Sequence, residues 1–526
     1  MPLSNPPAVQ SAASPGDQPR HDPEPDPPVD LDVLIVGAGP TGLTAAIDAV
    51  RHGLSVRIVD RAQTRSTFSK ALVAHARTLE IFQTMGVADA VVAEGTRFAA
   101  LHIHGRRRKK RVDLLGLPWG DTAYPFWLSI PQHSTERILE ERLHGLGVDV
   151  EWAVSFEKAT EYADHVEAHV LDRDGAPSVV RARWLVGCDG GRSRVRDQAG
   201  LRLDRAVSGA TFVLADVKTT ASLAEDEGHV FVVPEGLLFI VPMPEPRRWR
   251  IIAHELLPSS DPPATIDTTY VNDLVRRRTG WEFGSHDLTW QSRFELSHGV
   301  ADSYRRGRMF LAGDAAHVHS PVGGQGLNTG VQDAHNLLWK LASARHLSED
   351  DATELLDTYV AERSAVGKAM VDGVARMTRL ITTRKGLTRR LFGAAGPMIS
   401  GRPSIQKRLG RGVGMLELGY VQDTSRSRMD GRRMPNPTLR GGQRLHERLD
   451  PVSHTWVTRR NADDGMMNID DSRWGGLPVV FVSDDDIAVA DRDSLGGMPE
   501  AVLVRPDGYI AADDHVRFAP TTTRSR

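Results

Sequence analysis

The chain has 526 residues, of which 40% are hydrophobic and 25% charged, and its formal net charge is -3. These values are typical of a globular protein and exclude a mainly disordered or fibrous chain. The near-neutral charge indicates neither a nucleic-acid partner nor a membrane surface. At about 150 residues per domain, the length predicts two to four domains. Cys188 is the only cysteine, which excludes an internal disulfide and favours a cytoplasmic location.

Residues 1–28 contain nine prolines and almost no large apolar side chains. Such a segment cannot bury enough surface to offset the entropy lost on ordering, so we expect a disordered tail. It also lacks the apolar core of a signal peptide. Because no stretch of about 18 apolar residues occurs anywhere in the chain, we expect no membrane-spanning helix.

The ordered part begins with a strand–helix–strand pattern. Residues 31–36 are apolar and end at a glycine, as buried parallel strands do. Residues 41–52 carry an apolar stripe with helical spacing, and residues 55–59 predict a second strand. Together these segments predict one βαβ unit.

A glycine-rich loop joins the first strand to the helix. The segment Gly37-Ala38-Gly39-Pro40-Thr41-Gly42 matches G-x-G-x-x-G in the structural context that this motif requires. Gly37 permits the tight turn, Gly39 lets the backbone approach a pyrophosphate, and Gly42 allows close packing of helix on strand. The helix amino terminus offers N–H groups to the phosphates, and Asp60 can accept hydrogen bonds from the adenosine ribose. The motif predicts dinucleotide binding but does not distinguish FAD from NAD.

The middle of the chain changes character several times. The region from about 98 to 121 is polar, basic and turn-rich, and a helical pattern follows at 135–146. Between 211 and 293, short apolar runs alternate with polar turns, which predicts an antiparallel sheet. The clearest strands are expected at 184–186, 230–233, 237–241, 249–253 and 309–312. Helices are expected at 328–344 and 352–377, and two further strands at 477–482 and 501–504.

A second glycine-rich segment runs from Gly307 to Gly330. A predicted strand ends at Gly313-Asp314, and a loop then leads to a helix that begins near Asn328. Asp314 can accept hydrogen bonds from a polyol such as ribityl, and the helix start can stabilise the negative charge of a reduced flavin. An NAD enzyme needs no such second site, so this segment favours FAD.

These motifs together resemble the FAD-dependent single-component aromatic hydroxylases, the group of para-hydroxybenzoate hydroxylase and phenol hydroxylase. The segment Cys188–Arg196, with Asp189-Gly190, resembles the part of the family pattern that serves both FAD and the nicotinamide cofactor. The resemblance covers residues 32 to 363. More weakly, the region from Gly431 resembles the thioredoxin-like C-terminal domain of the phenol hydroxylase branch. Further matches are Ser69–Ala71, His75–Glu80, Pro131-Gln132, Thr135-Glu136, Gln332–Leu337, Trp339–Ala342, Tyr359, Glu362, Arg363 and Val504–Tyr509.

The fold implied by this resemblance is α/β. A Rossmann-like FAD-binding domain is interrupted by an antiparallel-sheet substrate domain and is followed by a helical stretch and a small thioredoxin-like α/β domain. The expected boundaries are 29–97, 128–205 and 295–395 for the FAD-binding domain, 98–127 and 206–294 for the substrate domain, 396–430 for a linker and 431–520 for the last domain. That last domain has no cysteine, so we expect it to serve packing or subunit contact. A chain ending near Asp430 should lose stability or change its oligomeric state, while surviving molecules keep FAD.

The activity implied by the resemblance is hydroxylation of an aromatic compound, phenolic or of polyketide type. FAD is the bound cofactor, NADPH or NADH the transient reductant, and O₂ the oxidant, with oxygen transfer through a flavin C4a-hydroperoxide. A small aromatic molecule is the expected partner, no nucleic acid or membrane is expected, and a homodimer is one expected assembly. A flavin reductase or oxidase without oxygen insertion, and a FAD-bound scaffold without activity, stay open as alternatives.

The resemblance also implies site residues. Pro321 is the candidate for shaping the oxygen-transfer site. Arg250 is a candidate for contacting flavin or substrate, with a solvated strand charge as the alternative. Lys70 stands where many relatives carry arginine, so it keeps the charge but loses the bidentate geometry. The expected cofactor contacts are Gly37, Gly39, Pro40, Thr41, Gly42, Asp60, Arg61, Lys70, Arg77, Gln132, Asp189, Arg196, Gly313, Asp314, Pro321, Gly323, Gly324, Gly326, Leu327 and Asn328.

Three other signals have ordinary explanations. The pairs His102/His104 and His317/His319 lack a third ligand at suitable spacing, so no metal site is expected. The basic run Arg106–Arg111 is expected to be a solvated strand edge, with the steering of an anionic substrate or NADPH as the alternative. Cys188 follows an apolar strand and is expected to be a small buried hydrophobe.

Overall fold

The fold is seen in a computed structural model of the chain. It describes residues 29–67, 71–105, 109–233, 236–255, 265–318, 324–382, 408, 410–412, 414–420, 430–458, 477–482, 486–487, 495, 498–499 and 501–511. The expected tail at 1–28, most of the expected linker at 396–430 and residues 512–520 of the expected last domain lie outside these residues. So do Lys70, Pro321, Gly323, His319 and Arg106–Arg108.

A mostly parallel sheet forms the centre of the part that is expected to bind FAD, which we call the FAD-binding part. Its main strands have the order β17-β18-β11-β1-β2-β8, and β10 and β9 extend it beside β11. Neighbours from β18 to β8 pair in parallel, and β1, α1 and β2 form the expected βαβ unit. The strands are β1 (Leu31–Val36), β2 (Val56–Asp60), β8 (Val150–Trp152), β9 (Ser155–Glu161), β10 (Val166–Leu171), β11 (Pro177–Gly187), β17 (Arg305–Arg306) and β18 (Met309–Leu311).

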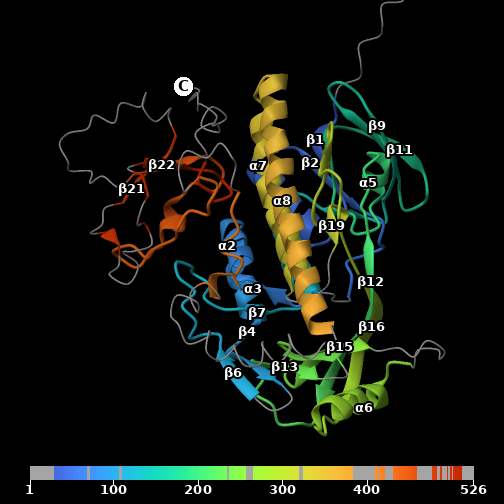
Figure 1. The fold of residues 1–526 in the computed structure, drawn as a ribbon. Coiled ribbons are helices and arrows are strands. Elements are labelled where there is room, and N and C mark those ends of the chain that lie inside the picture. Colours follow the sequence, from blue (N-terminus) through green and yellow to red (C-terminus); the bar gives the residue numbers. More distant parts are fainter. Residues whose placement is uncertain are drawn as a thin grey trace, which may run out of the picture.

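Helices from distant parts of the sequence pack around this sheet (Figure 1). Helix α1 contacts both α4 and α7, and α7 contacts α2 and the long helix α8. The largest apolar core of the described residues lies between the sheet and these helices. The helices are α1 (Pro40–Arg51), α2 (Ala76–Thr84), α3 (Ala88–Glu94), α4 (Gln132–Gly145), α5 (Arg194–Gln198), α7 (Gln325–Ala344) and α8 (Glu349–Thr382), with a small sheet of β3 (Val73–Ala74), β7 (Leu128–Ser129) and β4 (Thr96–Arg97).

A second sheet lies below α8 in Figure 1, with α6 (Thr268–Thr279) on its far side. Its order is β19-β16-β12-β15-β14-β13-β5-β6, and its pairs are antiparallel except for the parallel pair β13–β5. Its longest strand runs through residues 294 and 295, where the sequence predicts a domain boundary. The strands are β5 (Ala100–His104), β6 (Lys109–Asp113), β12 (Ala206–Thr219), β13 (Glu227–Val233), β14 (Gly236–Pro242), β15 (Arg248–Glu255), β16 (Ser285–Val300) and β19 (His317–Val318).

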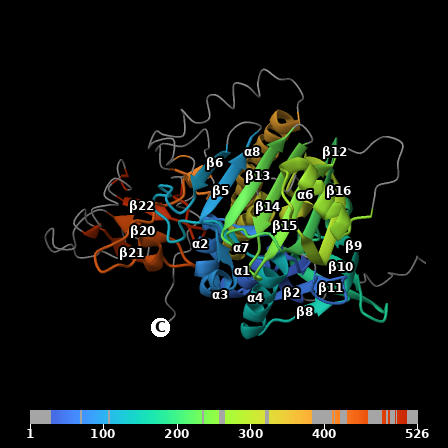
Figure 2. The same ribbon diagram turned by 90° about the horizontal axis from the view of Figure 1, so that it is seen from below.

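The described residues from 430 to 511, which we call the C-terminal unit, lie beside α2 (Figures 1 and 2). Three strands form its sheet in the order β21-β20-β22, with β20 (Thr455–Thr458) parallel to β21 (Val479–Phe481) and antiparallel to β22 (Ala501–Val504). A short 3-10 helix, η2 (Leu445–Arg448), precedes them. The likeness of this unit to thioredoxin stays a prediction.

Buried charges join the C-terminal unit to the FAD-binding part. Arg433 is almost fully buried and donates to Glu80 on α2, at 2.5 and 2.8 Å, and to the carboxylate of Asp121 at 2.8 Å. Although burial opposes ionisation, the Arg433 guanidinium lowers the pKa of Glu80 to about 2. Arg505 likewise donates to Glu362 on α8 at 2.6 Å, and Glu362 also accepts from Lys340 on α7 at 2.8 Å. The two parts therefore share a charged interior.

Candidate functional site

Three segments that are distant in the sequence meet at the amino-terminal end of α1. Gly37 has φ +105°, and a Cβ on it would clash with the backbone of Cys188 and Asp189. A Cβ on Gly313 would lie 2.6 Å from the Thr41 hydroxyl. The first glycine loop, the Asp189 segment and the Gly313-Asp314 segment are therefore in direct contact, and this contact requires the absence of side chains at Gly37 and Gly313.

Two helices begin at this place without a capping side chain. Helix α1 starts at Pro40 with Gly39 as its N-cap residue, and α7 starts at Gln325 after Gly324, whose φ is +63°. No side-chain oxygen accepts a hydrogen bond from the first N–H groups of either helix in the described structure. These N–H groups and the positive ends of both helix dipoles are available to an anionic group. A Cβ on Gly39 would meet no atom within 4 Å, which leaves room for a pyrophosphate beside the loop.

Three carboxylates surround these helix starts. Asp60 accepts from the Ala38 N–H at 2.7 Å and so braces the first glycine loop. Asp189 accepts from the Arg194 N–H at 2.6 Å through one oxygen, while its other oxygen is buried without a partner among the described residues. Asp314 is exposed, and its carboxylate has no hydrogen bond within the described residues. The site thus offers acceptors that fit the hydroxyl groups of a ribose and a ribityl chain.

Other expected contacts lie near this site. Gln132, at the start of α4, accepts from the Ala71 N–H at 3.1 Å. Arg61 is exposed just after β2. Gly326 and Leu327 are partly exposed in the first turn of α7. These placements are compatible with the roles expected for them.

Three residues expected to contact the cofactor have side chains that bond within the protein, and their cofactor roles stay predictions. Arg77 is buried, donates to Glu80 and to the carbonyl of Asp507, and lies 5.2 Å from the centre of the Tyr509 ring. Arg196 donates to the carbonyls of Ala315 and Gly191. A further buried side chain, Asn328, bonds with four residues of the protein, Val73, His75, Thr78 and Gly324. These hydrogen bonds fix the three side chains next to the glycine segments.

Glu136, which the sequence singles out only within a family match, is a buried acid in this region. It lies one helical turn after Gln132, whose side-chain amide donates to it at 2.8 Å. Burial raises its pKa to about 7, and the carboxylates of Asp60 and Glu140 add to the effect. The sequence shows an acid four residues after a glutamine, but it does not show that this acid is desolvated.

Glu136→Gln is expected to stabilise the apoprotein at neutral and higher pH. The folded-state pKa of Glu136 is above its usual value near 4.5, so folding favours the protonated form. Stability is therefore lost as the pH rises from 4.5 to 7, and glutamine removes this loss. The melting temperature should rise by about 2–5 °C at pH 8 and not at pH 4. An equal gain at both pH values would contradict the explanation by ionisation.

The second sheet has two contrasting faces. Side chains on one face, including Val213, Ile240 and Ile251, pack against α6 in a closed apolar core. The opposite face also carries apolar side chains, and α8 contacts it at β14 and β16. Phe212 and Leu214 on this face are buried, whereas its other apolar side chains are partly exposed. Cross-strand pairs place the following residues on that face: Phe212, Leu214, Phe239, Val241, Ile252, Trp290 and Phe294. We call this set the apolar face; apolar surface of this kind, turned toward the FAD-binding part, suits a flat hydrophobic ligand.

Arg250 lies among the residues of the apolar face, but it is neither solvated nor free. Its side chain is 1% exposed and forms two hydrogen bonds of 2.8 Å with Asp216. The guanidinium carbon lies 4.9 Å from the centre of the Trp290 ring. The alternative of a solvated strand charge is therefore wrong: Arg250 is a buried charge bonded to Asp216 and close to Trp290, and its contact with flavin or substrate stays a prediction. Nearby, burial lowers the pKa of His133, and the Arg250 guanidinium contributes to this.

Comparison with known proteins identifies the family. The profile of a family described as FAD binding domain matches residues 30–374. The chain belongs to this family. It is 36% identical to 6-methylpretetramide 4-monooxygenase of Streptomyces rimosus, over 94% of this chain and 92% of the relative. It is 32% identical to rifampicin monooxygenase of Rhodococcus hoagii, over 91% of this chain and 94% of that relative. The solved structure of OxyS anhydrotetracycline hydroxylase from Streptomyces rimosus has a TM-score of 0.72 and 30% identity, covering 94% of this chain and 97% of that one.

These relatives confirm the cofactor and the class of reaction predicted from the sequence. The chain is a flavin-dependent monooxygenase and binds FAD, so the alternatives of a reductase, an oxidase or an inactive scaffold are wrong. The predicted α/β fold is that of the aromatic hydroxylases, whereas nothing tests the likeness of the C-terminal unit to thioredoxin.

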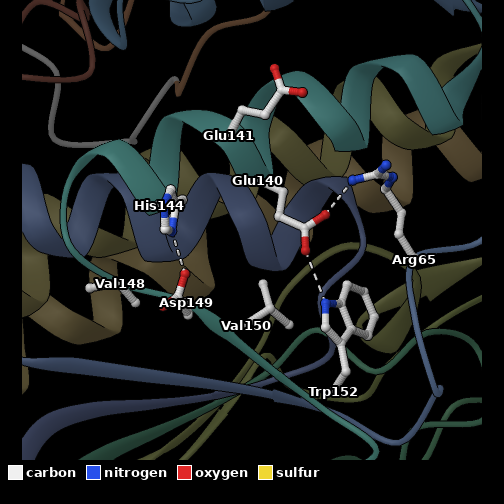
Figure 3. A pocket seen from close by; sticks show the side chains of 8 residues that line it. All are labelled: Arg65, Glu140, Glu141, His144, Val148, Asp149, Val150 and Trp152. Atoms are coloured by element: carbon white, nitrogen blue, oxygen red, sulfur yellow. Dashed lines mark hydrogen bonds and ion pairs between the residues drawn. The ribbon is translucent and has the colours of Figure 1, made fainter.

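A pocket of about 410 Å³ lies at the outer edge of this monooxygenase, between α4 and the edge strand β8 (Figure 3). Glu140 accepts from Arg65 and from the Trp152 indole N–H, and His144 bonds with Asp149 at 2.6 Å. The arginine that lines this pocket is already paired, and three carboxylates also line it. We therefore do not expect the pocket to bind a phosphate group of a cofactor.

The remaining signals from the sequence have structural partners. The imidazole of His102 bonds with Glu227 at 2.5 Å, and that of His317 with Asp333 at 2.7 Å. Strand β6, which carries the end of the basic run, is an edge strand, as expected. Burial raises the pKa of the Cys188 thiol, so it does not act as a nucleophile at neutral pH. Within the described residues, no helix is long and apolar enough to cross a membrane.

Proposed function

We propose that this monooxygenase hydroxylates a flat aromatic substrate, phenolic or polyketide-derived, with O₂ and NAD(P)H. The apolar face is the observation that carries this proposal, because five of its seven side chains are partly exposed and it is turned toward the FAD-binding part. The relatives support it, since their names give 6-methylpretetramide and anhydrotetracycline as substrates. Both names denote polycyclic compounds, so we favour a polycyclic substrate over a single-ring phenol.

The chain contributes binding and exclusion of water. FAD supplies the reduction of O₂ and the transfer of one oxygen atom when it is bound. Asp314, Asp60 and the starts of α1 and α7 would hold its ribityl, ribose and phosphate groups. Side chains of the apolar face, such as Ile252 and Phe294, would bury the substrate rings and keep water away from the reacting atoms. Pro321 stays our candidate for shaping the oxygen-transfer site.

The proposal can be tested with two candidate substrates, a linear tetracyclic polyphenol and phenol. The purified FAD-loaded enzyme is supplied with NADPH or NADH and with ¹⁸O₂, and products are analysed by mass spectrometry. We expect a product that gains one labelled oxygen atom from the tetracyclic compound, with NAD(P)H oxidation stimulated by that compound. Oxidation of NAD(P)H that yields only H₂O₂ with both compounds would contradict the proposed substrate class.

Ile252→Ala tests the apolar face directly. Loss of about three buried carbon atoms at roughly 0.8 kcal/mol each should raise the KM for the tetracyclic substrate by up to about 50-fold. The neighbouring Ile251→Val is the matched control, because Ile251 points to the α6 side of the sheet. Equal changes of KM in both variants would show that the substrate does not bind on this face.

Three further points belong to the proposal. NADPH or NADH is the expected reductant and binds transiently, as the resemblance implies. A cytoplasmic location is supported by the single cysteine. A homodimer is the expected assembly, and light scattering of the FAD-loaded enzyme would establish it.

A further inference from the structure

A buried arginine on α8 connects three separate segments. Arg363 is fully buried, and its Nε donates to Asp333 on α7 at 2.7 Å. Its two terminal nitrogens donate to the carbonyl of Thr329 at 3.2 Å and to the hydroxyl of Tyr420 at 3.1 Å. All three nitrogens of this guanidinium group therefore donate hydrogen bonds, and the position of the group depends on each acceptor.

Asp333 connects this arginine to the second glycine segment. One carboxylate oxygen accepts from Arg363, and the other accepts from the Gly313 N–H at 3.0 Å and from His317 at 2.7 Å. Asp333 thus holds both ends of the turn formed by residues 313–317, and Asp314 lies in this turn. The carboxylate is fully buried, so no water can replace a lost partner without rearrangement.

Tyr420 connects the same arginine to the C-terminal unit. Its ring lies 4.3 Å from the ring of Tyr509, and the guanidinium carbon of Arg505 lies 5.1 Å from its centre. Its backbone N–H donates to the carbonyl of Gly431 at 2.6 Å. A continuous chain of buried contacts therefore runs from the C-terminal unit to the turn that carries Asp314.

We propose that Tyr420, Arg363 and Asp333 form a relay through which the C-terminal unit positions the 313–317 turn for FAD. None of the three is proposed to touch the cofactor, so all are positioning residues. A hydrogen bond to a charged, buried group is directional, and losing it lets the guanidinium shift and with it the carboxylate that holds Gly313. This inference rests on the proposed placement of the FAD ribityl chain at Asp314.

Tyr420→Phe tests the relay by removing one oxygen atom. We expect the dissociation constant of FAD, measured by titrating apoprotein and following flavin fluorescence, to rise about three- to tenfold. Tyr509→Phe is the matched control. It removes the hydroxyl of the adjacent ring, and within the described residues that hydroxyl has no hydrogen bond. Its FAD affinity should equal that of the wild type.

A double-mutant cycle separates positioning from general loss of stability. In the Asp314→Ala background, Tyr420→Phe should have a much smaller effect on FAD affinity, because the turn no longer holds the cofactor. Additive effects, or a Tyr420→Phe variant that melts earlier yet binds FAD like the wild type, would overturn the relay. If Asp314→Ala alone leaves FAD affinity unchanged, the placement of the ribityl chain is wrong and the relay falls with it.

Discussion

Arg433→Met is expected to destabilise the enzyme strongly. The variant leaves Glu80 and Asp121 buried without their shared cation, and breaking a buried ion pair in this way typically costs about 3–5 kcal/mol. Methionine fills a similar volume, so the effect reports charge and not a cavity. The melting temperature should fall by about 5–15 °C, which differential scanning fluorimetry of the FAD-loaded enzyme can measure.

The preceding residue provides the control. Arg432 is exposed, so Arg432→Met should leave the melting temperature within about 1 °C of the wild type. A double variant, Arg433→Met with Glu80→Gln, should recover part of the loss because it removes one of the two stranded carboxylates. If Arg432→Met and Arg433→Met melted alike, the buried charges between the C-terminal unit and α2 would not stabilise the fold.

Asp314→Ala should weaken FAD binding by a factor of about ten or more, since a hydrogen bond to a charged group contributes about 1.5–3 kcal/mol. The prediction depends on the exposed carboxylate of Asp314, which has no partner among the described residues and follows Gly313, the residue that contacts Thr41 at the start of α1 and Gly330 in α7. Equilibrium dialysis of FAD against apoprotein measures the effect. Retention of wild-type affinity would show that the ribityl chain lies elsewhere.

Asp60→Ala is the comparison at the other end of the cofactor, and we expect a smaller loss of affinity. Asp60 accepts from the N–H groups of Ala38 and Ala62, and water can replace it there because the side chain is only partly buried. A larger loss in Asp60→Ala than in Asp314→Ala would reverse the assignment and place the dominant polar contact at the adenosine end.

The structure changes what we expect of a shortened chain. From the sequence, an enzyme ending near Asp430 should lose stability while its surviving molecules keep FAD. Such a chain lacks Arg433, so Glu80 and Asp121 lose the arginine that they share. It also lacks Arg505, so Glu362 keeps Lys340 as a partner but loses its arginine. Because Glu80 lies on α2 and Glu362 on α8, the loss extends to the elements that support the FAD site. We therefore expect such a chain to lose FAD affinity together with stability.

Much of the fold can be predicted because its signals are local. The apolar run of β1, the glycine loop, the helical stripe of α1 and the strand β2 follow one another directly in the sequence and define one βαβ unit. Short-range periodicity likewise predicts most of β13, β14, β15 and both long helices. It misses α6, which carries three arginines in its last turn, and the long strands β12 and β16, where polar and apolar residues do not alternate strictly.

The sequence by itself determined the cofactor, because the two glycine segments and Asp189 occur in a family pattern with few alternatives. Only the tertiary structure decided which polar side chains are free to bind it. Asn328 stands in that pattern, yet its side chain bonds with Val73, His75 and Thr78, about 250 residues away, as well as with Gly324. A sequence shows which groups a residue carries; whether these groups meet a protein partner, a cofactor or water depends on long-range packing.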